Sequence, residues 1–286
     1  MRITEEQKSV LDSLVVERLR DHRSENATLV NSFSNKKNPV LERIIRTKVS
    51  FDRDSEGTVA YYVVKAPTGE LLLYFSLKCG ELFEKLDQFK LDLAYRVKDA
   101  VNVLQHKEQY SNDVYNRAEV FINQNITEIK QILPDIDKYL EKKEGLSADL
   151  RKELNTEMQR VLKTYPAIEL QEFCANDNGR KIWKELGIKR KLGECVFWHK
   201  IVDMLDSVQK IAGCQYVYLF AADASADGEL VNYYKERLMF EQSAVLGANK
   251  PKYDFQCYFL CQSIIELNAK RNQFYEDFNI DSDSIV

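Results

Sequence analysis

The sequence contains little histidine and proline, and it has no long apolar run. Its 286 residues include 3 histidines and 5 prolines. No window approaches the roughly 18 consecutive apolar residues of a membrane span. His22, His106 and His199 are widely separated and lack the spacing of zinc ligands. These absences argue against a membrane-spanning segment and against a zinc site.

The 6 cysteines form no C-x-x-C pair, and they are Cys79, Cys174, Cys195, Cys214, Cys257 and Cys261. Each lies among apolar residues, and free cysteine is among the most buried residue types. We therefore expect reduced, mostly buried thiols rather than a disulfide framework. The opening MRITEEQKSV is charged from the start, which predicts no signal peptide and a cytoplasmic location.

The composition is that of a globular protein with much helix, because 44% of residues are hydrophobic and 30% are charged. The length allows one large domain or two small ones. A net charge of −4 argues against a dedicated nucleic-acid binder, although it leaves room for a local basic patch.

The first part of the chain predicts helices followed by a β-hairpin. Apolar residues at helical spacing predict a helix over 4–22, and a second helical region over 26–46 includes Pro39 as a first-turn residue. TVAYYVVK, residues 58–65, and ELLLYFSL, residues 70–77, are strands joined by a turn. A further short strand is considered over Lys48 to Phe51.

From about residue 81 to 163 the apolar residues recur at helical spacing, and no strand pattern is present. Their stripes are typical of helix-packing faces, so we predict an antiparallel helical hairpin or small bundle.

Strand patterns return at residues 167–174 and 215–221, and the second of these is the more apolar. Helices are predicted over 194–211 and 228–238, and a final pair of strands over 240–246 and 253–260. Because both strand groups have the composition of one sheet, we predict a single α/β sheet domain interrupted by an all-helical insert. The expected divisions are 1–80, 81–164 for the insert, 165–270, and 271–286 for an acidic tail.

The segment KRKLGEC, Lys189 to Cys195, has an R-x-x-G-x-small spacing directly before a predicted helix. A glycine turn that opens into a helix N-terminus can bind phosphate through backbone N–H groups. Gly193 permits close approach to the backbone, and Lys189, Arg190 and Lys191 add positive charge.

With its flanking elements, this segment resembles the GNAT acetyltransferase superfamily. AIELQEFC resembles the fourth strand of that family, RKLGEC its pyrophosphate loop, and CQYVYLFAADAS its fifth strand. GELVNYYKERLMFE resembles the fourth helix and the Y-x-x-x-G-F signature that follows it. The resemblance implies a mixed, mostly antiparallel central sheet flanked by helices.

The sequence departs from the family pattern at several places. Cys195 stands where the family has glycine or alanine, and residues 175–189 lengthen the stretch before the loop. Met239 replaces the glycine before Phe240, and one extra residue separates Tyr234 from Phe240. The helical insert is not a standard family feature either.

The resemblance implies that acetyl-CoA binds where the fourth and fifth strands splay apart. Its implied binding residues are Phe173, Cys174, Lys189, Arg190, Lys191, Leu192, Gly193, Glu194, Cys195 and Asn232. Tyr234 is implied as the acid that protonates the leaving thiolate, with Tyr233 as the alternative.

Glu172 is preferred over Glu169 as general base, because strand alternation places the two on opposite faces unless a bulge intervenes. Backbone N–H groups near Phe173 and Cys174 would meet the oxyanion. A Cys195–His199 nucleophile pair, with the two residues one helical turn apart on the same face, is the less favoured chemistry.

The function expected from these patterns is acetyl-CoA-dependent N-acetyl transfer to the amine of a small molecule or a protein. The alternative is a non-catalytic interaction protein, built on a degenerate GNAT domain with the helical insert as docking surface. An acetyltransferase toxin acting on charged tRNA is a third reading, to which the mild acidity of the chain gives little support. The helical insert has three open roles: covering the cleft, forming a homodimer, or binding a protein partner.

Overall fold

The computed structural model describes residues 2–85, 88–133, 161–223, 225, 227–249 and 257–280. The chain divides into two compact units. One comprises Met1–Leu82 with Tyr165–Val286, and the other comprises Phe83–Thr164.

A seven-stranded sheet runs through the fold in the order β1-β2-β3-β4-β5-β7, with β6 paired to β3. The strands are β1 (Val15–Arg18), β2 (Ala60–Lys65), β3 (Leu71–Lys85), β4 (Val161–Ala175), β5 (Tyr216–Ala221), β6 (Leu246–Gly247) and β7 (Tyr258–Ser263). The β1·β2, β2·β3 and β5·β7 pairs are antiparallel, and β4·β5 is parallel. The predicted mixed, mostly antiparallel sheet flanked by helices is confirmed, as is the β2–β3 hairpin.

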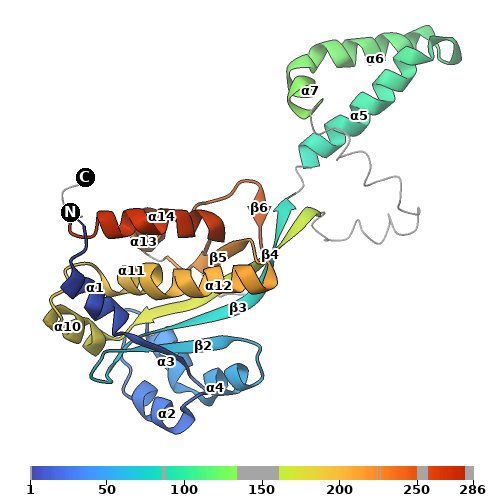
Figure 1. Ribbon diagram of the computed structural model, residues 1–286. Coiled ribbons are helices and arrows are strands. Elements are labelled where there is room, and N and C mark those ends of the chain that lie inside the picture. Colours follow the sequence, from blue (N-terminus) through green and yellow to red (C-terminus); the bar gives the residue numbers. More distant parts are fainter. Residues whose placement is uncertain are drawn as a thin grey trace. The chain divides into compact units, whose positions relative to one another are not determined.

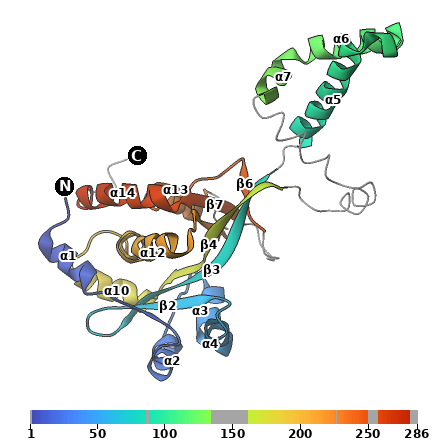
Figure 2. The same cartoon turned by 45° about the vertical axis from the view of Figure 1, so that its right-hand side comes forward.

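Helices cover both faces of the sheet in the first unit (Figures 1 and 2), with α2, α3 and α4 on one face and α1, α12 and α14 on the other. They are α1 (Glu5–Asp12), α2 (Arg23–Asn31), α3 (Pro39–Arg46), α4 (Lys48–Ser55), α10 (Asp177–Glu185), α11 (Leu192–Val196), the π-helical segment η3 (Phe197–Ile201), α12 (Val202–Ala212), α13 (Glu229–Arg237) and α14 (Ile264–Glu276). Segments α11, η3 and α12 follow one another without a break, as the predicted helix over 194–211 requires.

Each face of the sheet has its own apolar core. Phe75, Phe197 and Leu205 belong to the core beneath α10–α14, and Phe33 and Tyr74 belong to the core beneath α2–α4. Strand β4 contributes to both cores, so its two faces meet different surroundings.

Between the end of β3 and the start of β4, the second unit is helical where it is described. It contains α5 (Gln88–Gln105), the 3-10 turn η1 (Lys107–Gln109), α6 (Asn112–Gln124) and α7 (Ile126–Ile132). Leu93, Val97 and Ile129 are in its small core. The expected helical run is wrong at its ends, because β3 continues to Lys85 and β4 begins at Val161. Residues 86–87 and 134–160 of that run lie outside the described residues.

The predicted first helix is too long. A capping box at Thr4 starts α1, and the helix ends at Asp12 with Ser13 as C-cap. The chain then forms β1, in which Val15 and Val16 pair with Lys65 and Val64. Helical spacing of apolar residues continued by chance into a strand of β-branched residues, which pack well on a pleated surface.

Two further strand predictions are wrong. Lys48 to Phe51 is the first half of α4, whose Phe51 is buried under the sheet. The segment 240–246 does not form a long hairpin strand. It contributes only a bridge between Glu241 and Cys261 and the start of β6, which pairs with β3. Strand β7 pairs with β5 instead. Residues 250–256 lie outside the described residues.

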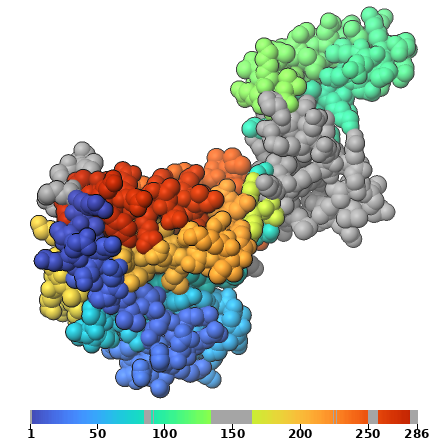
Figure 3. Space-filling view, viewed as in Figure 1, coloured from blue at the N-terminus to red at the C-terminus, as the bar shows by residue number. Residues whose placement is uncertain are grey.

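The segment expected to begin an acidic tail is structured through residue 280. Helix α14 extends to Glu276, and Phe274 and Phe278 are buried. Helices α1 and α14 lie side by side on the face shown in Figure 3, where the Ile3 N–H donates to the Tyr275 carbonyl. Among the described helices, none is both long enough and apolar enough to cross a membrane.

Candidate functional site

Strands β4 and β5 pair over only three positions, from Ala167↔Tyr216 to Glu169↔Tyr218. Beyond them β4 continues to Ala175 and β5 to Ala221 without pairing to each other. We call the end of this pairing the fork. An unpaired strand edge offers backbone N–H and C=O groups to an extended ligand that contains amides.

The helical run α11–η3–α12 begins beside this part of β4. Lys191 is its N-cap residue and makes no side-chain capping bond. The N–H of Cys195 already donates to the Lys191 carbonyl. The N–H groups of Leu192, Gly193 and Glu194 precede the first helical bond, so they are the orphan donors that favour an anion.

Neighbouring side chains leave no room for a side chain at Gly193. A Cβ on Gly193 would lie 2.8 Å from the Tyr233 hydroxyl and 3.4 Å from the Phe173 ring. The Lys191 ammonium lies 5.6 Å from the centre of the Tyr233 ring. We call Phe173, Lys191, Gly193 and Tyr233 the cradle.

Arg190 does not face the cradle. Its Nε donates to the Phe278 carbonyl at 2.6 Å, and its other nitrogens bond to the Asp277 carbonyl and to Glu194. Its guanidinium also lies 5.2 Å from the centre of the Phe274 ring. Arg190 therefore fixes the chain after α14 to the start of α11, and its charge is balanced by Glu194.

The other predicted residues of this loop divide into exposed and buried ones. Lys189 and Lys191 are exposed, so their ammonium groups can reach a ligand. Leu192, Glu194 and Cys195 are buried, so they can offer only backbone groups. The residues that lengthen this stretch form α10, whose Trp183 indole donates to the Arg190 carbonyl at 2.8 Å.

Two adjacent tyrosines of α13 point to different places. Tyr233 approaches Gly193, whereas Tyr234 is buried in the core beside Phe240. Burial raises the pKa of Tyr234, and the nearby Cys174 thiol of β4 adds to this rise. In the part of the chain that the structure describes, neither tyrosine hydroxyl has a hydrogen-bond partner.

Met239 adopts a left-handed backbone conformation of the kind that favours glycine. Its φ is 59°, and it is the one non-glycine residue with positive φ among the described residues. The Phe240 N–H donates to the Tyr234 carbonyl at 3.0 Å, which closes the turn after α13. The departure at Met239 thus leaves a glycine-type turn in place.

Glu172 lies on the opposite face of β4, and it is 5% exposed. The Ser76 hydroxyl donates to one carboxylate oxygen, and the Tyr61 hydroxyl donates to the other at 3.4 Å. Burial raises the pKa of Glu172 to about 7, and Arg53 partly offsets this rise. A carboxyl group with a pKa near neutrality can accept a proton under physiological conditions.

Glu169 lies on this same face, so alternation fails between the two glutamates. The Glu172 N–H donates to the Ser76 hydroxyl at 3.1 Å, and a β-bulge between the two glutamates accounts for the loss of alternation. Gln171, the residue before it, accepts from Arg53 of α4 at 3.1 Å. We call Arg53, Tyr61, Ser76, Glu169 and Glu172 the carboxylate cluster.

The remaining predicted residues lie outside both groups. The Cys174 sulfur accepts from Asn35 at 3.1 Å in the core under α2–α4. Asn232 is exposed at the start of α13, where it donates to the Asp227 carbonyl at 3.2 Å. No contact among the described residues brings either side chain to the cradle.

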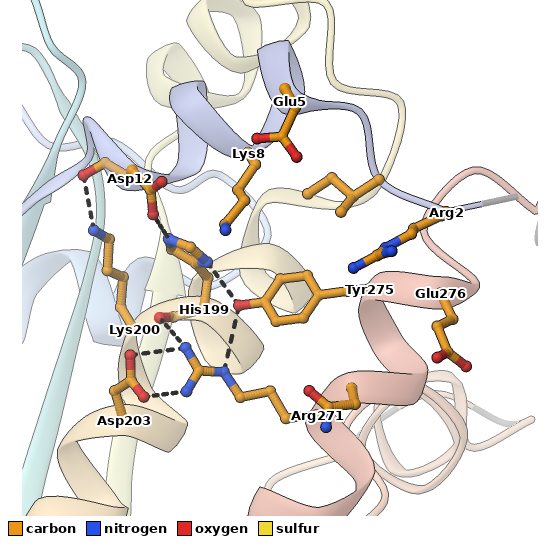
Figure 4. A pocket seen from close by; sticks show the side chains of 12 residues that line it. Arg2, Glu5, Lys8, Asp12, His199, Lys200, Asp203, Arg271, Tyr275 and Glu276 are labelled. Carbon is orange, nitrogen blue, oxygen red and sulfur yellow. Dashed lines mark hydrogen bonds and ion pairs between the residues drawn. The ribbon is translucent and has the colours of Figure 1, made fainter.

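A pocket of about 660 Å³ lies elsewhere, between α1, η3–α12 and α14 (Figure 4). His199 in its wall is bonded through Nδ1 to the Tyr275 hydroxyl at 2.7 Å and through Nε2 to Asp12 at 2.9 Å. Cys195 is fully buried, and burial raises the pKa of its thiol. Both ring nitrogens of His199 are thus engaged away from Cys195, which removes the basis of the Cys–His pair.

Sequence reasoning did not find Arg53, Tyr61 or Ser76. They come from α4, β2 and β3, far from β4 along the chain, and no spacing in the sequence links them to Glu172. Strand alternation would place Glu169 and Glu172 on opposite faces unless a bulge lay between them. The hydrogen bond from the Glu172 N–H to Ser76 is the sign of that bulge in the structure.

A comparison with models of known protein families found no match, and neither did a comparison with curated proteins. Solved structures do show similarity. A bacterial toxin is similar with 12% identity and a TM-score of 0.46, over 91% of this chain and 95% of that one.

AtaTR bound with acetyl-CoA gives 12% identity and a TM-score of 0.46, over 90% of this chain and 98% of that one. AtaT complexed with acetyl-methionyl-tRNAfMet gives 10% identity and a TM-score of 0.44 over the same 90% and 98%.

Proposed function

We propose that this chain is an acetyl-CoA-dependent N-acetyltransferase that acts on an amine by direct attack. The observation that carries the proposal is the fork. The β4·β5 pairing stops at Glu169, next to a helix start whose N–H groups are uncapped. This is the arrangement that the resemblance of the sequence to the GNAT superfamily requires.

The residues at the fork fit the chemistry of acetyl-CoA. The pyrophosphate is an anion, and the N–H groups of Leu192, Gly193 and Glu194 with Lys189 and Lys191 are suited to bind it. Gly193 leaves room for the Tyr233 hydroxyl and the Phe173 ring to pack against the start of the helix. When bound, acetyl-CoA supplies an acetyl thioester, and the chain need only position it and manage protons.

Glu172 is the proposed general base. It takes a proton from the acceptor ammonium, so that the neutral amine can form the new C–N bond. Its raised pKa means that the protonated product state is accessible near pH 7. Backbone N–H groups near Phe173 and Cys174 are proposed to stabilise the oxyanion.

Tyr234 is the proposed general acid. As the C–S bond breaks, the electron pair stays on sulfur, and the Tyr234 hydroxyl donates a proton to it. The tyrosine regains a proton from the amide nitrogen, so the whole reaction releases one proton from the original ammonium. The position of Tyr234 near Cys174 of β4 supports this choice over Tyr233, which approaches Gly193 instead.

Calorimetry with acetyl-CoA tests the proposed function. We expect binding in the micromolar range, with about the same affinity for CoA, because the cradle would bind the pyrophosphate common to both. If the purified full chain shows no heat at high micromolar acetyl-CoA, the enzyme is excluded and the non-catalytic interaction protein is favoured.

A further inference from the structure

The pocket between α1, η3–α12 and α14 is separate from the cradle and from the carboxylate cluster, because none of its lining residues belongs to either group. Its volume of about 660 Å³ falls within the range of roughly 300–1,000 Å³ of small-molecule sites. Figure 4 shows that charged side chains of both signs line it. A pocket of this size and polarity can hold a small charged molecule.

The floor of the pocket is a chain of hydrogen bonds with a fixed direction. The ionised Asp12 carboxylate can only accept, so His199 Nε2–H donates to it at 2.9 Å. In neutral His199 the other ring nitrogen, Nδ1, then accepts from the Tyr275 hydroxyl at 2.7 Å. Burial and the Lys200 ammonium lower the pKa of His199, which favours this neutral form. The Tyr275 oxygen in turn accepts from Arg271 Nε at 3.3 Å.

Two carboxylates in the wall are already neutralised by neighbouring groups. Asp203 accepts two hydrogen bonds from the Arg271 guanidinium, one of them at 2.7 Å. The Lys200 ammonium donates to the Asp12 carbonyl at 3.1 Å, on the residue whose carboxylate binds His199. The floor and this part of the wall therefore use their polar groups on one another.

The unpaired charges come from the N-terminal segment. Among the described residues, the Arg2, Glu5 and Lys8 side chains form no ion pair or hydrogen bond. Glu5 and Lys8 lie one turn apart on α1, a spacing at which opposite charges can pair. Both side chains instead point into the pocket, and the Arg2 guanidinium points toward Tyr275 (Figure 4). The Glu276 carboxylate points away from the centre, so two cations and one carboxylate face the space.

The backbone of this segment is anchored to α14 and the residues after it. The Ile3 N–H donates to the Tyr275 carbonyl at 2.8 Å, and the Asn279 side-chain amide donates to the Arg2 carbonyl at 2.9 Å. Asn279 also accepts from the Gln7 side chain of α1 at 2.8 Å. An anchored segment loses less conformational freedom when a ligand binds, which favours affinity.

We propose that this pocket binds a small acidic α-amino acid. The two carboxylates of the ligand pair with Arg2 and Lys8, and its ammonium pairs with Glu5, so that each unpaired charge finds one partner. The Arg2 guanidinium can bind a carboxylate through two parallel hydrogen bonds. The site is independent of the proposed acetyl transfer and requires no acetyl-CoA.

The charges disfavour two simpler classes of ligand. A dicarboxylate without an ammonium leaves Glu5 facing further negative charge. An amino acid with one carboxylate leaves either Arg2 or Lys8 without a partner. Both classes should therefore bind more weakly than the acidic amino acid.

Calorimetry on the full chain without acetyl-CoA at pH 7.5 tests this inference with three probes. L-glutamate carries all three charges, glutarate lacks the ammonium, and L-glutamine lacks the second carboxylate. Exposed ion pairs are weak individually, so we expect L-glutamate to bind at least about threefold more tightly than either analogue.

Variants of the three side chains assign the binding to this pocket. Arg2→Gln and Lys8→Gln should each lower L-glutamate affinity at least about threefold, and the double variant at least about tenfold. Glu5→Gln should remove the preference for L-glutamate over glutarate. Glu6→Gln is the matched control, because Glu6 is the next residue of α1, is exposed and lies outside the lining. It should leave the affinity and the preference unchanged.

Thermal unfolding should be the same in all these variants, because the substituted side chains are exposed. No binding of L-glutamate, equal binding of the three probes, or unchanged affinity in the double variant would each overturn the inference. A loss of affinity in Glu172→Gln as large as in the double variant would place the ligand at the carboxylate cluster and would overturn it equally.

Discussion

The two faces of strand β4 differ in what makes them suited to a ligand. The cradle on the α11 and α13 face is shaped by steric fit, since Gly193 leaves room for Tyr233 and Phe173. The carboxylate cluster on the α4 face is shaped by charge, since two buried glutamates lie beside Arg53 and Lys78. Cofactor binding and the general base are thus assigned to opposite sides of one strand, and they should respond to different variants.

The largest effect is expected on kcat, for a variant of the proposed general acid. Tyr234→Phe should lower kcat by about 10²–10⁴-fold, the range of general acid–base catalysis. Acetyl-CoA affinity should stay within about twofold, because Tyr234 lies apart from the cradle. Steady-state kinetics paired with calorimetry check this.

Tyr233→Phe is the matched variant, since it removes the neighbouring hydroxyl. If it lowers kcat as much as Tyr234→Phe does, the acid belongs to the cradle, and the assignment of the acid to Tyr234 fails.

A variant of Arg190 tests whether the charge of this residue stabilises the fold or binds acetyl-CoA at the cradle. Arg190→Ala should reduce the free energy of unfolding by about 3–5 kcal/mol, because it leaves Glu194 buried and unpaired. Urea unfolding measures this loss. Lys189→Ala, the exposed control, should keep full stability. A stable Arg190→Ala protein with weakened acetyl-CoA binding would contradict the structural role.

The charge of the carboxylate cluster predicts a pH dependence of stability. The folded-state pKa of Glu172, about 7, exceeds its ordinary value of 4.5. The folded state therefore binds more protons between these values, and stability falls as pH rises through this window. The shift corresponds to about 3 kcal/mol. Glu172→Gln should remove this slope and be the more stable protein at pH 8.

Urea unfolding at several pH values between 4.5 and 8 measures the slope, and Glu81→Gln, a variant of an exposed carboxylate on β3, should retain it. An equally steep pH dependence of stability in Glu172→Gln would show that the buried Glu172 carboxyl is not its cause.

The smallest effect concerns the turn that supports Tyr234. Met239 has a positive φ, which costs a residue with a side chain roughly 1–2 kcal/mol relative to glycine. Met239→Gly should raise the free energy of unfolding by about 1 kcal/mol, since Met239 is 38% exposed and little packing is lost. Met239→Ala keeps the strain and should not be stabilised, whereas stabilisation of both variants would point to a cause other than the turn.

Much of the fold could be predicted because its strands and long helices have regular patterns. The β2–β3 hairpin, β4, β5 and the helices after them lie where the sequence indicates. The short β1 could not be separated from α1, since its valines continue the helical spacing. The partners of β6 and β7 depend on tertiary pairing, which the local sequence does not record.

The candidate site was predictable to a lesser extent. Gly193 and Glu172 could be singled out because a glycine before a helix and an acid in a strand are visible in the sequence. The sequence could not show that Arg190 turns inward, because its partners Asp277 and Phe278 lie far along the chain. The strand bulge and the buried state of Glu169 also arise only from packing.

Acetyl-CoA titration of Gly193→Ala, with and without Tyr233→Phe, tests the central claim most directly. Alanine favours the helix, so the variant should fold. Its methyl group should lower affinity at least about tenfold, and removal of the Tyr233 hydroxyl should not restore binding, because the methyl blocks the backbone itself. Wild-type affinity in Gly193→Ala, or full recovery in the double variant, would contradict a cofactor site at the fork.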